Sequence, residues 1–216
     1  MKDIYILGVG HNTVVYIDLA EACGYHIKGL YHYNRERTGE IYYGYKILGS
    51  FDDLFSLKSL ENMNFALSQG DNKIRSELFY KILHAKGTIP TLIHPTATVS
   101  SRAKLGVGVI VHINSVVHPD TSIGDDTVLS YNTSLTHSSH IGNHCYLAFN
   151  SHIGAYTKVD DFVFMGIGSI SISGKVDVIG KNSFIGAGAL LTKSVEPGCV
   201  MVGSPARILK KLNDKE

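Results

Sequence analysis

His137 is the residue in this chain whose type and position best suit acid–base chemistry. It lies in the polar segment Asn132–Gly142, two residues after Leu135 and directly before Ser138. An imidazole takes up and returns protons near neutral pH, so a histidine that faces a substrate is a candidate general base. Ala155 follows eighteen residues later. Its small side chain leaves room for a ligand beside the imidazole, and a backbone N–H at such a position can face a reacting centre.

The interval of eighteen residues belongs to a repeat in the C-terminal half of the chain. An aliphatic residue recurs at every sixth position from Ile93 to Met165, and after a two-residue slip the repeat resumes at Ile179. Helices have a period near 3.6 and strands a period of 2, so neither selects every sixth residue. Triangular coils with three six-residue faces do, and stacked coils bury a continuous column. The members are Ile93, Val99, Leu105, Val111, Val117, Ile123, Leu129, Leu135, Ile141, Leu147, Ile153, Val159, Met165, Ile179, Ile185 and Leu191.

This repeat predicts a parallel β-helix in which His137 and Ala155 occupy the same coil corner in successive coils. Leu135 points inward, so His137 stands outside the column. The slip between Met165 and Ile179 predicts a bulge or loop. Glycines near the repeat suit corners that need a permissive backbone φ; they are Gly106, Gly124, Gly142, Gly154, Gly166, Gly180 and Gly186.

The first ninety residues follow a different pattern, with short apolar strands alternating with helices. Such alternation predicts a small parallel α/β sheet of Rossmann-like type, so we expect an α/β domain over 1–90 and a β-helix over 91–216. The expected strands are Ile4–Leu7, His26–Tyr33 and Asn64–Leu67, and the expected helices are 12–23, Phe51–Leu60 and Lys73–Lys86, the last with Ile74, Leu78 and Ile82 on one side.

The turn Gly8-Val9-Gly10 joins the first strand to the first helix. Backbone N–H groups at a helix N-terminus suit an anion such as a pyrophosphate. A third glycine and an acid at the end of the second strand are both absent, so the turn is weak evidence for a dinucleotide.

Composition excludes several classes of partner. The net charge of +1 gives no basic excess for nucleic acid or an anionic membrane. The start of the chain reads as a strand, and no stretch is long enough to span a bilayer. The three scattered cysteines fit reduced thiols in the cytoplasm. Carbonic anhydrases of the β-helix type bind zinc through histidines of adjacent coils, but this chain lacks a clear three-histidine pattern, so no metal is expected.

The C-terminal run Ile185–Arg207 resembles the closing coil of hexapeptide-repeat acyltransferases. Together with the GxGH opening and the segment Gly70–Arg75, the whole chain resembles one subgroup of that family. The subgroup contains sialic acid O-acetyltransferases and nucleotide-amino-sugar N-acetyltransferases of bacterial glycan synthesis. The resemblance implies a homotrimer of left-handed β-helices that binds acetyl-CoA in the groove between subunits.

Site residues follow from the resemblance position by position. His137 matches the catalytic histidine, and Ala155 matches the residue whose N–H faces the thioester oxygen. Ile167 and Ala187 match positions lining the pantetheine groove, and Lys193 and Arg207 lie where basic side chains meet the CoA phosphates. The resemblance also assigns the nucleotide-sugar pocket to Gly10, His11, Asp71 and Asn72, although the last two residues could instead cap a helix.

The chain departs from the family pattern at three places. Ser138 replaces the acidic residue that usually follows the histidine, and Ser130 replaces an asparagine. His32-Tyr33 replaces the acidic pair at the end of the second strand. We therefore expect a hydroxyl, a backbone carbonyl or another subunit to orient His137.

The predicted function is a cytoplasmic acetyltransferase that moves an acetyl group from acetyl-CoA to the amino group of a nucleotide-activated sugar, with His137 as general base. O-acetylation of a sialic-acid-like sugar is the alternative of the same class. A trimeric β-helix that has lost catalysis and serves as a binding or scaffold protein is the alternative of another class.

Overall fold

The computed structural model describes residues 2–212, which divide into two compact units between Leu92 and Ile93. No helix in the described part of the chain is long and apolar enough to cross a membrane.

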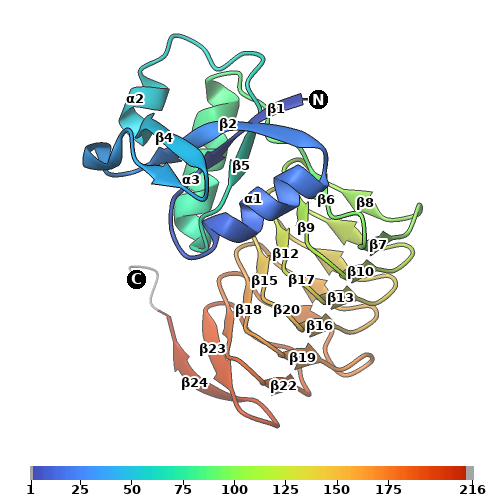
Figure 1. The fold of residues 1–216 in the computed structure, drawn as a ribbon. Coiled ribbons are helices and arrows are strands. Elements are labelled where there is room, and N and C mark those ends of the chain that lie inside the picture. Colours follow the sequence, from blue (N-terminus) through green and yellow to red (C-terminus); the bar gives the residue numbers. More distant parts are fainter. Residues whose placement is uncertain (1, 213–216) are drawn as a thin grey trace. The chain divides into compact units, whose positions relative to one another are not determined.

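The N-terminal unit is built around a five-stranded sheet with the order β3-β4-β2-β1-β5 (Figure 1). Strand β1 pairs in parallel with β2 and β5, β2 pairs in parallel with β4, and only the β3–β4 pairing is antiparallel. The elements are β1 (Lys2–Leu7), α1 (Thr13–Ala22), β2 (Tyr25–His32), the 3-10 helix η1 (Arg35–Arg37), β3 (Ile41–Tyr42), β4 (Tyr45–Ser50), α2 (Phe51–Phe55), β5 (Phe65–Leu67) and α3 (Asn72–His84).

The expected α/β character is confirmed, with three differences in detail. Helix α2 ends at Phe55, whereas the expected helix continues to Leu60. The sequence gives no expectation for β4, although β4 pairs with β2 and buries Ile47 completely. Helix α3 buries Leu78 and Ile82, but Ile74 is 49% exposed. Ile74 lies in the first turn of α3, where its N–H is occupied by the capping side chain of Asp71 and its own side chain points to solvent.

The C-terminal unit is a left-handed parallel β-helix, as the six-residue repeat predicts. Figure 1 shows its coils stacked from β7 to β22. Three sheets form its faces. We call them sheets A, B and C in the order in which a coil meets them after His94. Sheet A contains β7 (Thr98–Val99), β10 (Val116–Val117), β13 (Ser134–Leu135), β16 (His152–Ile153), β19 (Ile170–Ser171) and β22 (Leu190–Leu191).

Sheet B follows sheet A along each coil, and sheet C follows sheet B. Sheet B contains β8 (Lys104–Leu105), β11 (Ser122–Ile123), β14 (His140–Ile141), β17 (Lys158–Val159) and β20 (Val178–Ile179). Sheet C contains β6 (Leu92–Ile93), β9 (Ile110–Val111), β12 (Val128–Leu129), β15 (Tyr146–Leu147), β18 (Phe164–Met165), β21 (Phe184–Ile185), β23 (Cys199–Val202) and the antiparallel closing strand β24 (Arg207–Lys211).

The second residue of each two-residue strand points inward and builds the predicted column. From Val111 to Met165 every member of the repeat is buried, whereas Ile93 at the first coil is 39% exposed. The repeat is interrupted because Ser171, and not an aliphatic residue, takes the inward position of β19, where it is 1% exposed. The two extra residues fall in the following corner, 172–177, so strand pairing continues unbroken on both sides.

The corner glycines serve a purpose other than the expected one. Gly142, Gly154 and Gly166 do not have a positive φ; that conformation belongs to corner residues such as Asn132 (φ 58°) and Ser138 (φ 57°). A Cβ on Gly154 would lie 2.5 Å from the backbone nitrogen of the next coil, and one on Gly166 would lie 2.6 Å from backbone atoms. These glycines are needed because neighbouring coils approach too closely for a side chain.

Candidate active site

His137 lies in the corner 136–139, between β13 on sheet A and β14 on sheet B. Leu135 before it is completely buried, and Ser139 after it is buried with its hydroxyl donating to the Thr136 carbonyl at 2.7 Å. These two anchors hold the corner, and the His137 side chain is exposed. The sequence-based placement of the imidazole outside the aliphatic column agrees with this geometry.

Two side chains contact the imidazole. The Ser138 hydroxyl lies 3.3 Å from His137 Nδ1. The ring of Tyr156, one coil along, lies edge-to-face with the imidazole at a centroid distance of 5.3 Å and an interplanar angle of 88°. When Nδ1–H donates to the Ser138 hydroxyl, Nε2 carries the lone pair that accepts a proton.

Ala155 stacks on His137 as the eighteen-residue interval predicts, but its N–H already has a partner. This N–H donates to the Ser173 hydroxyl at 2.8 Å, so it does not face open space beside the imidazole. Ser173 occupies the same position one coil further, in the enlarged corner 172–177. The expected use of the Ala155 N–H for a developing negative charge therefore requires the Ser173 hydroxyl to turn away.

Two further histidines belong to this side of the β-helix. His152 on sheet A is half-buried, and its Nε2 lies 3.3 Å from the Thr136 hydroxyl. Burial lowers the pKa of His152, and the nearby charge of His118 lowers it further. A neutral imidazole at His152 keeps a second positive charge away from the corner that carries His137.

Two of the remaining predicted acetyl-CoA residues lie at another corner of the β-helix. Ile167 and Ala187 stack in the corner between sheets C and A, where the Gly188 N–H donates to the Ile167 carbonyl at 2.7 Å. Ile167 is 44% exposed and Ala187 is exposed too. Within one chain, sheet A separates this corner from the corner of His137. Lys193 is exposed after β22, in the last coil of the corner series that carries His137, and Arg207 is exposed at the start of β24.

In the N-terminal unit, the residues predicted to bind substrate lie at the carboxyl ends of β1 and β5. Gly10 and His11 are exposed after β1, and Asn72 begins α3. Asp71 caps α3 by accepting the Ile74 N–H at 2.9 Å. The helix-capping alternative for Asp71 is thus realised, although one carboxylate oxygen can still face a ligand.

Two residues at this edge were not expected from the sequence. The Tyr42 hydroxyl of β3 donates to the Gly10 carbonyl at 3.0 Å, and the Ser68 hydroxyl after β5 lies 3.1 Å from the Gly8 carbonyl. The sheet order changes direction beside β1, because β2 and β5 flank it. Ligands of open α/β sheets bind at such points. The Gly10 N–H, however, is bonded to the Thr13 hydroxyl at 2.8 Å.

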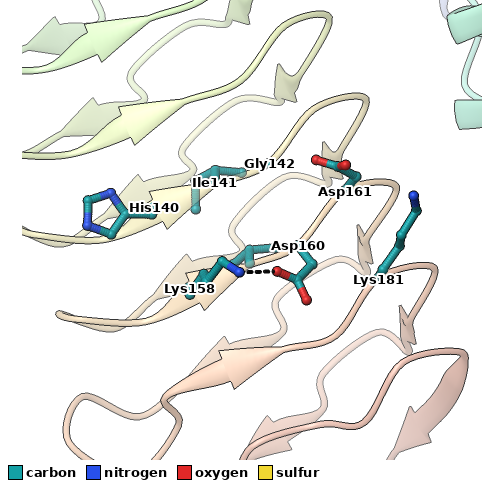
Figure 2. A pocket seen from close by; sticks show the side chains of 8 residues that line it. His140, Ile141, Gly142, Lys158, Asp160, Asp161 and Lys181 are labelled. Atoms are coloured by element: carbon teal, nitrogen blue, oxygen red, sulfur yellow. Dashed lines mark ion pairs between the residues drawn. The ribbon is translucent and has the colours of Figure 1, made fainter.

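A pocket of about 300 Å³ lies on sheet B and its following corner. Figure 2 shows the Lys158–Asp160 ion pair among the lining side chains, with Asp161 and Lys181 to one side. The nitrogen and oxygen of this pair lie 2.8 Å apart. It is lined by His140, Ile141, Gly142, Lys158, Val159, Asp160, Asp161 and Lys181. None of the residues that the sequence predicts to bind substrate or acetyl-CoA, or to act in catalysis, lines this pocket. Among residues 2–212, no group of three or more His, Cys, Asp or Glu side chains is arranged to hold a metal ion.

Comparison with known proteins finds one matching domain and several similar folds. Residues 3–82 match the PglD N-terminal domain. The whole fold is similar to PerB from Caulobacter crescentus, solved in complex with CoA and GDP-perosamine, with a TM-score of 0.88, 26% identity, and coverage of 97% of this chain and 98% of that chain. It is also similar to a variant of GDP-perosamine N-acetyltransferase from the same organism, with a TM-score of 0.80, 25% identity and 98% coverage of both chains.

A curated relative matches over a shorter stretch of sequence. Galactoside O-acetyltransferase from Lactococcus lactis is 40% identical over 58 residues, which span 27% of this chain and 27% of that enzyme. The match thus covers about a quarter of the relative's own length. The stacked six-residue repeat, the PglD-type N-terminal domain and the full-length structural similarity make this chain similar to acetyltransferases of the hexapeptide-repeat type.

Proposed function

We propose that the protein transfers an acetyl group from acetyl-CoA to the amino group of a nucleotide-activated amino sugar in bacterial surface-glycan synthesis. The observation that carries this proposal is an exposed histidine at a coil corner, within a fold that matches a sugar N-acetyltransferase over 98% of both chains. We assign the role of general base to His137. We also assign the protein to the cytoplasm, where buried thiols such as Cys145 and Cys199 remain reduced.

Acetyl-CoA supplies the acetyl group in activated form, as a thioester. His137 Nε2 accepts a proton from the sugar amine as the nitrogen attacks the thioester carbonyl, and the new C–N bond replaces the C–S bond. The imidazolium then returns the proton to the departing sulfur. A well-placed general base contributes roughly 10²–10⁴-fold to such a step.

The exposed residues of the β-helix suit the parts of acetyl-CoA. Ile167 and Ala187 offer an apolar corner to the pantetheine arm, and Lys193 and Arg207 offer cations to the phosphates. His137 and Ile167 lie at different corners of the same chain. A ligand that contacts both kinds of corner is therefore best accommodated between two copies, and we propose a homotrimer in which the two corners of each site come from neighbouring subunits.

The nucleotide end of the sugar is assigned to the N-terminal unit. Exposed Gly10 and His11 and the first turn of α3, which holds Asn72, lie at the carboxyl ends of β1 and β5. This edge of a parallel sheet is where nucleotides bind in related folds. Relatives solved with GDP-perosamine support a nucleotide-linked acceptor.

The test is consumption of acetyl-CoA across a panel of UDP-, GDP- and dTDP-linked amino sugars and free sialic acids. One nucleotide-linked amino sugar is expected to turn over, and His137→Asn is expected to lower kcat by at least about a hundredfold. His140→Asn is the matched control, because His140 is exposed three residues away on the outer face of sheet B. An unchanged kcat in His137→Asn overturns the assignment of the base.

O-acetylation is the second candidate, because the local sequence match is to galactoside O-acetyltransferases. The same panel separates the two reactions. Turnover of a hydroxyl acceptor without turnover of any amino sugar favours O-acetylation. Turnover of no acceptor, together with an unchanged melting temperature in excess acetyl-CoA, favours a binding or scaffold protein, because any ligand of the native state stabilises it.

A further inference from the structure

We propose that Tyr156 is a positioning residue for His137, and that its aromatic ring holds the imidazole in the orientation that acetyl transfer requires. This inference rests on the proposed function, because it concerns the base assigned there. It follows from the edge-to-face contact between the two rings, with centroids 5.3 Å apart.

Tyr156 is the one large side chain in its own vertical series of corner residues. It belongs to a vertical series of corner residues, all with positive φ: Asp120 (60°), Ser138 (57°), Tyr156 (62°) and Gly174 (69°). Small residues or an acid occupy the other positions, as expected for a left-handed backbone. A tyrosine with a positive φ has a strained backbone. Because the Tyr156 side chain is 70% exposed, it adds little to the hydrophobic core. A strained residue without a packing role points to a function for its side chain.

The imidazole needs the support of the Tyr156 ring because its hydrogen bond to the Ser138 hydroxyl is weak. The Ser138 hydroxyl is uncharged, lies 3.3 Å from Nδ1, and is partly exposed to water. The neighbouring hydroxyls of Thr136 and Ser139 are bonded elsewhere, to His152 and to a backbone carbonyl. One long hydrogen bond leaves the imidazole free to rotate about its Cβ–Cγ bond.

Tyr156 restricts that rotation from the adjacent coil. Its backbone N–H donates to the His137 carbonyl at 3.4 Å, so the two residues are linked at the backbone as well as through their rings. Perpendicular aromatic pairs attract each other beyond the area that they bury. With Ser138 at Nδ1 and Tyr156 at the ring, the imidazole keeps one orientation and directs Nε2 away from the corner. The phenol hydroxyl plays no part in this role.

The experiment compares Tyr156→Asn with Tyr156→Phe. Asparagine removes the ring and suits the backbone, because this chain places asparagine at positive φ in other corners, such as Asn132 and Asn150. Phenylalanine keeps the ring and removes only the hydroxyl. We expect Tyr156→Asn to lower kcat roughly two- to tenfold, with the KM values for acetyl-CoA and sugar nearly unchanged, and Tyr156→Phe to restore most of that loss.

A spectroscopic measurement on the free enzyme provides a second readout. The ring current of Tyr156 shifts the NMR signals of the His137 imidazole protons. These signals are expected to move in Tyr156→Asn and to stay in place in Tyr156→Phe, while thermal melting shows that both variants are folded. An unchanged imidazole spectrum in the Asn variant overturns the proposal.

The kinetic outcomes separate this inference from the proposed function. If His137→Asn is inactive but Tyr156→Asn keeps the full kcat, the positioning role is wrong and the base assignment stands. Equal losses in the Asn and Phe variants indicate a role for the hydroxyl, and a rise in the sugar KM alone indicates direct contact with substrate. Either result overturns the proposal. Full activity of His137→Asn refutes the base itself.

Discussion

At the scale of single residues, the hydrogen bond that the structure shows for the His137 imidazole is to a hydroxyl and not to a carboxylate. The Ser138 hydroxyl can accept from Nδ1–H, but it brings no negative charge to an imidazolium. In triads with a carboxylate, that charge fixes the tautomer and stabilises the cation that forms during proton transfer. A substitution at Ser138 is therefore expected to change how well the His137 imidazole is oriented and how strongly its cationic form is stabilised.

Ser138→Asp is expected to raise kcat by roughly three- to tenfold, because a charge-assisted hydrogen bond is about twice as strong as a neutral one. Aspartate tolerates this backbone, since Asp120 has the same positive φ one coil earlier. Steady-state kinetics provide the measurement. Ser138→Asn is the control of equal shape, and an equal gain in that variant would show that charge is not the cause.

His112 makes the stability of the β-helix depend on pH. Burial, followed by the charge of His94, lowers the pKa of His112 from 6.5 to about 4. Between these two pH values the unfolded chain binds a proton that the folded chain does not, so stability is present above pH 6.5 and is lost as pH falls towards 4. The loss is up to about 3 kcal/mol.

Urea denaturation of His112→Gln at several pH values tests this dependence. The variant is expected to lose less stability between pH 6.5 and pH 4 than the parent chain does. His140→Gln removes an exposed imidazole from the same unit and should keep the slope of the parent. If the two variants show the same slope, His112 is not the source of the acid sensitivity.

At the scale of elements, the corners of the β-helix contain two kinds of position: one that needs a positive φ and one that, at some corners, needs a glycine because the next coil lies close. Asparagine, aspartate, serine, aromatic residues such as Phe162 and some glycines such as Gly168 adopt the positive φ that closes each turn. Glycines at other corner positions, such as Gly166, allow the next coil to approach. Side chains also link successive coils: the Val107, Asp125 and Asn143 N–H groups donate to Asp125, Asn143 and Asp161 side chains, each at 2.8 Å. The stack that aligns His137 with Tyr156 is held by such contacts.

Gly166→Ala and Gly168→Ala distinguish the two kinds of glycine. A Cβ on Gly166 meets backbone atoms of the next coil at 2.6 Å, so we expect a loss of about 3 kcal/mol. Gly168 has a φ of 63° and open space around it, so alanine there costs about 1 kcal/mol. Urea midpoints measure both values. Equal costs would contradict the close-approach explanation for Gly166.

At the scale of the whole molecule, the predicted acetyl-CoA residues divide between two corners of each chain. His137 and Ala155 stack at the corner between sheets A and B, and Ile167 and Ala187 stack at the corner between sheets C and A. This division is the basis for proposing that each site forms between copies.

Mixing two inactive variants tests whether sites are shared between copies. His137→Asn and Ile167→Glu should each be inactive alone. The second variant places a carboxylate against the apolar pantetheine arm, which would bury its charge. Mixed trimers made by denaturing and refolding the two together should regain about a quarter of the parent activity, since that share of sites receives both intact corners. No recovery in trimers of verified mixed composition would contradict a shared site.

The sequence by itself determined the β-helix, its eighteen-residue coil and the corner that carries His137. Each coil buries one aliphatic side chain per face, so an aliphatic residue recurs at every sixth position and can be recognised in the sequence. The α/β unit was determined only in outline, because β3 has two residues and β4 pairs with β2, from which η1 and β3 separate it along the chain.

Only the tertiary structure decided which groups surround the imidazole. Tyr156 contacts His137 from one coil along, and the Ala155 N–H is bonded to Ser173 in a corner enlarged by two residues. Ring orientation and hydrogen-bond partners depend on side-chain rotamers and on the distance between coils, which a repeat of residue types does not encode. The period gives the position of the site along the chain, and packing between coils decides which atoms face His137.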